Sequence, residues 1–262
     1  MPQYENKTAL IVVRTYPTPA KKGAEVSCTA AITDSGEWLR IFPVPWRYLD
    51  EAQQFHRYEW IELTIVKSSD SRPESYRLAS NGIRRLRRVP NWKQRRETID
   101  PLRAHCLCCL KATCDKDGHP TLGLFKPRKI VKLTITPEDN SDWTAAQIAI
   151  LEQGHLFAKK PTKRLEKIPL KFQYEFFCDH DTCTGHKMIC TDWEMAEAWR
   201  RWKNAYGPKW EEKFRQRFEK DMIEKYDTHF FVGTMHGHPG TWIIVGLYYP
   251  SHELQGTLSL AP

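Results

Sequence analysis

The feature that most constrains this chain is a short loop crowded with potential metal ligands. Residues 178–190 read Cys-Asp-His-Asp-Thr-Cys-Thr-Gly-His-Lys-Met-Ile-Cys, so three cysteines and two histidines share one loop. Thiolate and imidazole are the ligands that tetrahedral zinc prefers, and short spacings bring them together at little entropic cost. Gly185 favours a tight turn between two of them, because glycine tolerates positive φ. The loop therefore predicts a bound zinc ion.

The predicted zinc ligands follow a C-x4-C-x2-H-x3-C pattern: Cys178, Cys183, His186 and Cys190. A closed set of four protein ligands leaves no open coordination position, so such a zinc would stabilise the fold. The fourth position stays open at this point, because three histidines compete with Cys190 for it: His180, His236 and His238. A site with three protein ligands and a water would instead favour catalysis. The alternative without metal is a set of reduced cysteines packed near a helix.

Composition places the chain among ordinary folded proteins with a basic surface. It has 262 residues, a formal net charge of +8 and eight cysteines. We find no apolar run near the roughly 20 residues needed to cross a membrane, and residues 1–8 lack the pattern of an export signal. We therefore expect a cytoplasmic protein with reduced thiols or metal-bound cysteines, and no disulfide framework. The positive charge permits a polyanionic partner.

The first third of the chain predicts strands. Residues 8–16 are rich in β-branched side chains, and residues 28–32 and 38–44 flank the turn signal Asp34-Ser35-Gly36, which indicates a hairpin. Residues 58–66 alternate and predict a further strand. The expected fold class is α+β, with an N-terminal β-rich half, a small antiparallel sheet or partial barrel, and a zinc-stapled C-terminal α+β half. We place the domains at 1–158 and 165–262, or as one compact unit, around the basic stretch Lys159–Arg164.

Later segments predict helices and further strands. We expect helices over 98–115 and 142–157, the second capped by Ser141, and one that begins after Asp192. Residues 122–127, 130–135, 172–177, 230–233 and 241–249 read as strands. The segment Trp210–Tyr226 carries aromatic and apolar residues at i+4 spacing, which is typical of a buried helix face or of a surface for a protein partner.

The most basic segment of the sequence predicts contact with nucleic acid. Eight residues in it are candidates: Arg84, Arg85, Arg87, Arg88, Trp92, Lys93, Arg95 and Arg96. Clustered arginines suit phosphate groups, and Trp92 offers a ring on which a base could stack. Residues 126–132 continue the basic character. The alternative is a solvated helix face with Leu86 and Trp92 turned inward.

Two other groups of residues carry weaker signals. In the loop at residues 70–77, Arg72 and Arg77 could orient an anion, although local ion pairs explain the same pattern. A second metal site among the cysteines at 106, 108, 109 and 114 is conceivable, but small apolar packing is the favoured interpretation. A hydrolase or nuclease would need carboxylates or histidines beside a metal; the candidates are Asp70, Glu74, Asp192, Glu194 and the His236/His238 pair.

Several short pieces of the sequence together resemble a group of uncharacterised bacterial proteins. They are Thr15-Tyr16-Pro17, Gly36-x-Trp38-Leu39-Arg40-Ile41-x-Pro43, Asp70-x-Arg72-Pro73-Glu74-Ser75, Leu124-Phe125-Lys126-Pro127, Cys178-x4-Cys183-x2-His186, Asp192-Trp193-Glu194, and Phe231-Val232-Gly233 with Trp242 and Tyr249-Pro250. The resemblance covers most of the chain and implies a bacterial cytosolic protein, but it brings no activity. The sequence contains no P-loop, GxSxG, HExxH or GxGxxG motif.

These observations favour a zinc protein that binds DNA or RNA, as an accessory or sensor component of a bacterial nucleic-acid-handling or defence system. A metal-dependent nuclease or hydrolase is the alternative. A protein-interaction subunit that uses the Trp210–Tyr226 helix is the second alternative, and an exposed aromatic stripe would favour it.

Overall fold

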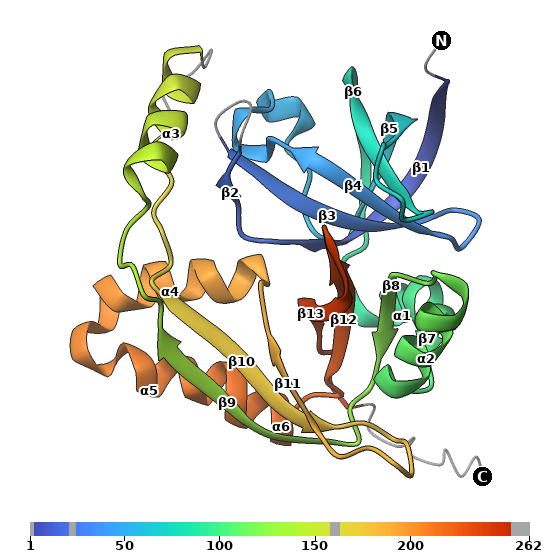
Figure 1. The fold of residues 1–262 in the computed structure, drawn as a ribbon, viewed down its shortest axis with the longest axis vertical. Helices are drawn as coiled ribbons and strands as arrows, with labels where there is room; N and C mark the ends of the chain where they lie inside the picture. Colours follow the sequence, from blue (N-terminus) through green and yellow to red (C-terminus); the bar gives the residue numbers. More distant parts are fainter. Residues whose placement is uncertain (1–2, 21–24, 158–162, 253–262) are drawn as a thin grey trace, which may run out of the picture.

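The N-terminal part of the chain is a closed barrel of five strands, seen in the computed structural model, which describes residues 3–20, 25–157 and 163–252 (Figure 1). Its strands are β1 (Tyr4–Arg14), β3 (Glu25–Thr33), β4 (Trp38–Val44), β5 (Glu59–Lys67) and β6 (Ser75–Arg88). They pair in the order β1-β5-β6-β4-β3, and β1 also pairs with β3, which closes the barrel. Only the β4–β6 contact among these pairs is parallel. The short β2 (Thr18–Pro19) pairs antiparallel with the start of β3.

The barrel follows from the alternation of inward-facing and outward-facing residues along its strands. In β5, buried residues alternate with partly exposed ones, so one face of the strand points into the barrel. The interior holds Ile11, Leu39, Ile61 and Leu63, and Phe55 enters it from a connection that contains two short 3₁₀ turns, Trp46–Tyr48 and Glu51–Gln53. The predicted hairpin is confirmed: β3 and β4 are antiparallel around Gly36, whose φ is +81°.

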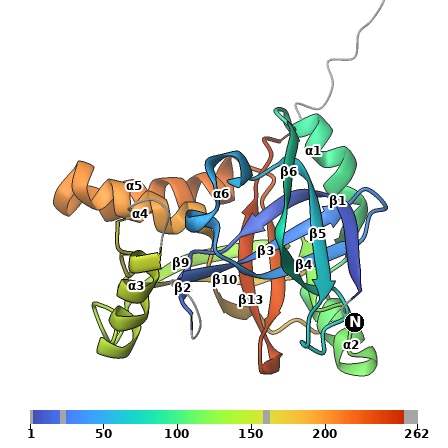
Figure 2. The same cartoon turned by 90° about the horizontal axis from the view of Figure 1, so that it is seen from above.

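A four-stranded sheet packs against the outside of the barrel (Figure 2). It contains β13 (His238–Tyr248), β12 (His229–Met235), β8 (Leu122–Phe125) and β7 (Arg103–Ala104), in that order. Phe231, Val245 and Tyr248 from this sheet share one buried cluster with Leu10 and Val13 from β1. The barrel and the rest of the chain are therefore joined by a continuous apolar contact.

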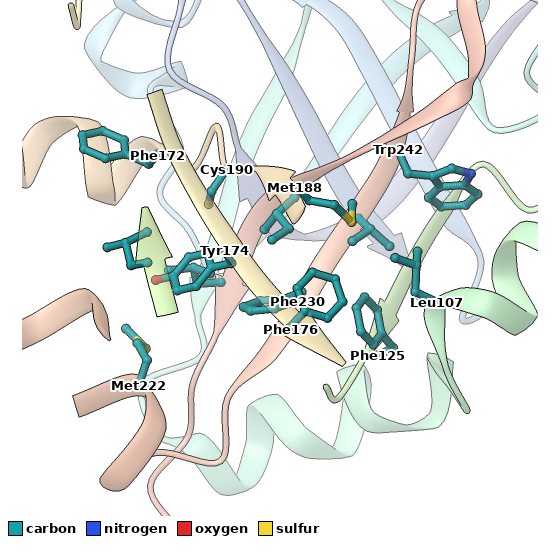
Figure 3. Close-up of a cluster of buried hydrophobic side chains, with 14 of the residues drawn as sticks. Leu107, Phe125, Phe172, Tyr174, Phe176, Met188, Cys190, Met222, Phe230 and Trp242 are labelled. Carbon is teal, nitrogen blue, oxygen red and sulfur yellow. The ribbon is translucent and has the colours of Figure 1, made fainter. Parts of the chain in front are cut away.

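A three-stranded sheet and a helical layer enclose the largest core. The sheet has the order β11 (His186–Ile189), β10 (Leu170–Phe177) and β9 (Lys129–Pro137). Helix α4 (Trp193–Tyr206) leads through a short 3₁₀ turn (Gly207–Lys209) to a second helical segment, formed by α5 (Trp210–Arg215), a π turn (Gln216–Lys220) and α6 (Asp221–Glu224). Figure 3 shows the core between them, where Tyr174 and Phe176 of β10 meet Phe230 of β12, with ring centroids 5.1 and 5.2 Å apart.

Three further helices lie outside these layers: α1 (Trp92–Ile99), α2 (Leu107–Asp117) and α3 (Ala145–Phe157), with a 3₁₀ turn at Asp100–Leu102. The predicted helix over 98–115 is wrong as one element, because Pro101 ends the first helix and the short strand β7 intervenes. In α3, Thr144 supplies the first helical hydrogen bonds, so the cap lies three residues after the predicted Ser141. No helix in the described part of the chain is long and apolar enough to cross a membrane.

The expectation of an N-terminal β-rich half in an α+β fold is confirmed. Strands from both sides of the expected boundary at 159–164 pair with one another, β9 with β10 and β8 with β12. Residues 158–162 of that stretch lie outside the described residues. The aromatic stripe is buried at Phe214, Phe218 and Met222, so it belongs to the core and gives no support to a protein-binding surface.

Candidate metal centre and basic cleft

Three thiols and one imidazole gather at the end of β10. The group contains Cys108, Cys178, Cys183 and His186, whose potential ligand atoms all lie within 4.8 Å of one another. The Sγ atoms of Cys108 and Cys178 are 3.2 Å apart, and His186 Nε2 lies 3.4 Å from each of them. The edges of a tetrahedral zinc site with the usual bond lengths measure about 3.6–3.8 Å. The group therefore has the composition and nearly the dimensions of a four-ligand metal site.

The loop that carries three of these side chains is held by its own backbone. Cys178 directly follows β10, its carbonyl accepts from the His180 N–H at 3.0 Å, and the His180 carbonyl accepts from the Cys183 N–H at 3.0 Å. Gly185 has a φ of +98° and returns the chain into β11, which begins at His186. The sequence predicted this turn from the glycine.

Cys108 reaches the group from a different element. It lies in the first turn of α2, where the Cys106 thiol caps the helix by accepting from the Cys109 N–H at 3.0 Å. Burial, together with the neighbouring Cys178 thiol, raises the pKa of the Cys108 thiol to about 12. A divalent cation would reverse this preference, because its charge stabilises thiolates. The donor set and its environment therefore fit a soft-ligand cation such as zinc.

Cys190, the fourth ligand in the sequence pattern, is not part of this group. Residues 186–189 form a strand, so Cys190 lies about 13 Å further along the chain from His186. Its backbone N–H donates to the Phe172 carbonyl at 2.8 Å, its thiol is 4% exposed, and burial raises its pKa. A helical turn would have placed Cys190 beside His186, but the strand carries it into the core, and Cys108 occupies the fourth place.

The histidines that competed for the fourth position also lie apart from the group. His180 is in the same loop, but its Nδ1 lies 3.1 Å from the Thr182 hydroxyl. His236 contacts Asp70 at 3.2 Å, at the turn that joins β12 to β13, and His238 begins β13. The group of Cys108, Cys178, Cys183 and His186 is the one set of three or more such side chains that the described residues bring together.

A polar cleft of about 600 Å³ borders the metal-ligand group. Its lining residues are Arg103, Ala104, His105, Lys126, Pro127, Arg128 and Asp179. Asp179 follows the candidate ligand Cys178, and His105 lies three residues before Cys108, so both walls of the cleft are attached to the metal-ligand group. Three of the lining side chains carry a full positive charge and one carries a negative charge, which makes the cleft basic. We call it the basic cleft below.

Asp227 joins the basic cleft to the arginine-rich segment. Its carboxylate lies 2.7 Å from Lys126 Nζ and 3.1 Å from a guanidinium nitrogen of Arg96, the last arginine of the predicted nucleic-acid segment. Arg103, which also lines the cleft, is 3.4 Å from His229 Nε2. The two basic stretches of the sequence, 84–96 and 126–132, therefore meet at one carboxylate, although 30 residues separate them along the chain.

The other basic residues of the predicted nucleic-acid segment fall into two groups, those with an ion-pair partner and those without one. Strand β6 sends Arg84 to Glu62 and Arg85 to Glu59, both on the neighbouring strand β5. Three of the basic side chains are exposed and have no ion-pair partner among the described residues: Arg87, Arg88 and Lys93. The segment is thus a strand end and a helix start, and not the single helix face that the sequence suggested as an alternative.

Trp92 packs inside the protein and is half-buried. Its ring centroid lies 5.7 Å from those of Tyr58 and Tyr248, and 5.9 Å from that of Tyr249. The Arg95 guanidinium covers it at 4.6 Å from the ring centroid. This geometry fits the alternative in which Trp92 turns inward more closely than a ring that is free for a base to stack on.

The carboxylates considered for hydrolysis are bound to arginines at two separate places. Asp70 contacts Arg72, and Glu74 lies 3.3 Å from Arg40. Asp192 and Glu194 both face Arg57, at 3.8 and 3.2 Å. Asp192 also caps α4, as the sequence predicted. These pairs resemble structural ion pairs, and the local ion-pair interpretation of the Asp70–Arg72 loop is confirmed.

Sequence reasoning considered Cys108 only for a second metal site, favoured core packing for it, and did not consider Arg103. The Cys-x-Cys-Cys pattern at 106–109 was a weak signal, because cysteines on a helix commonly pack in the core. The stronger signal lay in the loop itself, where three well-spaced ligands needed a fourth from elsewhere.

Comparisons with known proteins give two family matches. The model described as a domain of unknown function (DUF8758) matches residues 5–101, which span the barrel and α1. A second model, described as a domain of unknown function (DUF8757), matches residues 103–261, which is more than half of the chain and includes the metal-ligand group. No curated protein matches the sequence. A solved structure of a murine DNA binding protein bound with double-stranded DNA is similar over 94% of both chains, at 9% identity and a TM-score of 0.33, and this similarity is too low to carry an argument.

Proposed function

Because the chain belongs to a family described as a domain of unknown function (DUF8757), we propose its function from its own residues: it binds nucleic acid through the phosphate backbone, in the basic cleft beside a zinc-binding group. The observation that carries this proposal is the cleft itself, where Arg103, Lys126 and Arg128 line one polar hollow. Arginine and lysine bind phosphates by charge and by hydrogen bonds, and such contacts supply most of the affinity of non-specific binding.

Basic residues of the 84–96 segment extend the proposed binding surface beyond the cleft. Arg96 shares Asp227 with Lys126, and Arg87, Arg88 and Lys93 lie in the same segment as Arg96. A nucleic-acid backbone carries regularly spaced phosphates, so a row of cations binds it better than one deep pocket does. The whole set therefore suits a polymer better than a single small anion.

Zinc is the ion that we propose for the Cys108–Cys178–Cys183–His186 group, with a structural role. Cys3His sets that use all four positions are typical of structural zinc, which takes part in folding and not in chemistry. Here the ion would connect α2 to the loop after β10, and so hold together the two walls that carry His105 and Asp179. Removing it should widen or disorder the cleft and weaken nucleic-acid binding.

The test is a salt titration of binding to short single- and double-stranded DNA and RNA. Each phosphate contact contributes about 0.7–0.9 to the slope of log affinity against log salt. A variant with Arg103→Ala and Arg128→Ala should therefore bind all probes more weakly and flatten the slope by about 1.4–1.8. The matched control is the double variant Arg84→Ala with Arg85→Ala, which also removes two arginines, here those that pair with Glu62 and Glu59 on the barrel.

Two results would overturn the proposal. One is an absence of binding to every probe at low salt by the zinc-loaded protein. The other is an equal loss for the control and for the cleft variant, because net charge alone would then explain the affinity. Cleavage of a probe after addition of magnesium would instead support the nuclease alternative.

A further inference from the structure

A second cavity, of about 320 Å³, lies at the opposite end of β10 from the metal-ligand group. It opens to the surface and is lined by the segment Tyr16–Thr18 that leaves the barrel, by the start of β10, by the end of β11 and by the segments that flank α3. Figure 1 shows the start of β10, which lines the cavity, on the left and below α3. Its volume is at the lower end of the range of about 300–1,000 Å³ that is common for small-molecule sites.

The cavity has aromatic and aliphatic walls. These side chains are Tyr16, Trp143, Ile168, Leu170, Phe172 and Ile189. Tyr16 and Trp143 are half-buried, and hydrogen bonds hold them by their polar ends: the Tyr16 hydroxyl donates to the Glu166 carbonyl at 2.7 Å, and Trp143 Nε1 donates to the Leu165 carbonyl at 2.9 Å. Trp193 packs against Tyr16, with ring centroids 5.8 Å apart, and Lys167 Nζ lies 5.9 Å from the Trp143 ring centroid. A flat ligand would therefore use the apolar ring surface that these two contacts leave.

Ile189 strengthens the case for a ligand, because it is 38% exposed on the cavity wall. It ends β11, while Met188 before it points into the core and is 6% exposed. An exposed aliphatic residue by itself is ordinary, but here it lies in a hollow together with half-buried aromatic rings.

The charged residues of the lining are two lysines, Lys167 and Lys171, and two carboxylates, Glu138 and Asp192. Lys167 Nζ donates to the backbone carbonyl of Asn140 at 2.5 Å, and the described residues place no carboxylate within ion-pair distance of it. Lys171 lies 3.7 Å from Glu138, and both side chains are about one-third exposed, so this pair is weak. The buried Asp192 at the base of the cavity faces Arg57 at 3.8 Å. An anionic group beside Lys167 would therefore find a positive charge that no carboxylate neutralises.

We propose that this cavity binds a small aromatic anion of the nucleotide type, with its planar ring between Tyr16 and Trp143 and its anionic group at Lys167. This site is separate from the basic cleft, since the two lie at opposite ends of the eight-residue strand β10. The proposal does not depend on binding of a nucleic-acid polymer. The shared chemistry is a flat ring with a negative charge, which a nucleoside monophosphate or an aromatic carboxylate could supply.

Calorimetry on the zinc-loaded full chain tests this with four probes: adenosine 5′-monophosphate, adenosine, benzoate and inorganic phosphate. A nucleotide site predicts that the monophosphate binds at least about tenfold more tightly than adenosine or phosphate alone. Tighter binding of benzoate would identify an aromatic carboxylate as the anion, with the site unchanged. Absence of binding by both aromatic anions at millimolar concentration would overturn the proposal.

A matched pair of substitutions at Ile189 separates charge from packing. Ile189→Glu places a negative charge on the wall, and Ile189→Lys places a positive charge there, while both remove the same apolar surface. We expect Ile189→Glu to weaken binding of the monophosphate at least tenfold and Ile189→Lys to preserve or strengthen it. Equal weakening by both, or no effect of either, would place the anion elsewhere.

The basic cleft offers the control that keeps the two proposals apart. Arg128→Ala should leave binding of the monophosphate unchanged, because Arg128 lines only the cleft beside the metal-ligand group. Loss of monophosphate binding in Arg128→Ala, with no effect of Ile189→Glu, would assign the ligand to the basic cleft and overturn the second site. Unchanged circular dichroism in each variant is required before its binding is compared.

Discussion

Replacing Cys108 by alanine tests the assignment of the fourth ligand. Cys108 and Cys178 are 70 residues apart along the chain, whereas Cys178 and Cys183 are five apart. A metal that joins distant residues acts as a crosslink and restricts the unfolded chain, more so for a longer loop. For a loop of this length the chain-entropy relation gives about 4 kcal/mol, against about 2 kcal/mol for the short loop. Cys108→Ala should therefore lower the metal-dependent part of stability by about 4 kcal/mol.

The assay is urea unfolding of each variant with zinc bound and after chelation, with zinc content measured by elemental analysis. The difference between the two unfolding free energies isolates the metal-dependent part. Cys190→Ala is the control: it should destabilise both forms equally, since Cys190 is a buried core residue, and should leave one zinc per chain. If Cys190→Ala abolishes the metal-dependent part while Cys108→Ala preserves it, the ligand assignment is refuted.

Three further predictions concern stability. Phe176→Ala should cost about 3–5 kcal/mol in urea unfolding, because the ring is 1% exposed and its removal leaves a cavity in the main core. Asp192→Ala should cost more than the roughly 1 kcal/mol of a lost helix cap, because it also removes a partner of the partly buried Arg57. Asp192→Asn keeps an oxygen that can cap the helix and should recover that part of the loss. Hydrogen bonds from Arg72 hold the pKa of Asp70 well below its usual range, so its contribution to stability is present above about pH 4 and lost as pH falls further. Asp70→Asn should flatten the acid limb of stability against pH, measured by thermal melting between pH 2 and 5.

Local signals predicted those parts of the fold that depend on neighbouring residues. The turn at Gly36 set the β3–β4 hairpin, and Asp192 marked the start of α4, because a turn or a cap is decided within a few residues. The loop after β10 also came from local spacing, and three of its predicted ligands do meet. The fourth did not, since Cys108 reaches them only through the packing of α2.

The contacts of the basic segment could not be predicted from the sequence either, because they join residues that are distant along the chain. Its charges were visible in the sequence, but their partners were not, because Glu59 and Glu62 become neighbours of Arg85 and Arg84 only when β5 pairs with β6. Strand alternation sends successive arginines to opposite sides, so a run of charges in the sequence is not one surface in the fold. Arg103 drew no attention in the sequence, yet it lines the basic cleft.

The closure of the barrel has a consequence for synthesis on the ribosome. All five barrel strands lie within residues 4–88, so each has its partner long before His186 is made. At about 5–20 residues per second, the metal-ligand group is completed about 5–20 s after the last barrel strand. The apolar outer side of β1 waits longer still, because Phe231 and Val245, which cover it, come near the end of the chain. A nascent chain therefore carries a finished barrel with one uncovered apolar side, and that side is where premature association or a chaperone would act first.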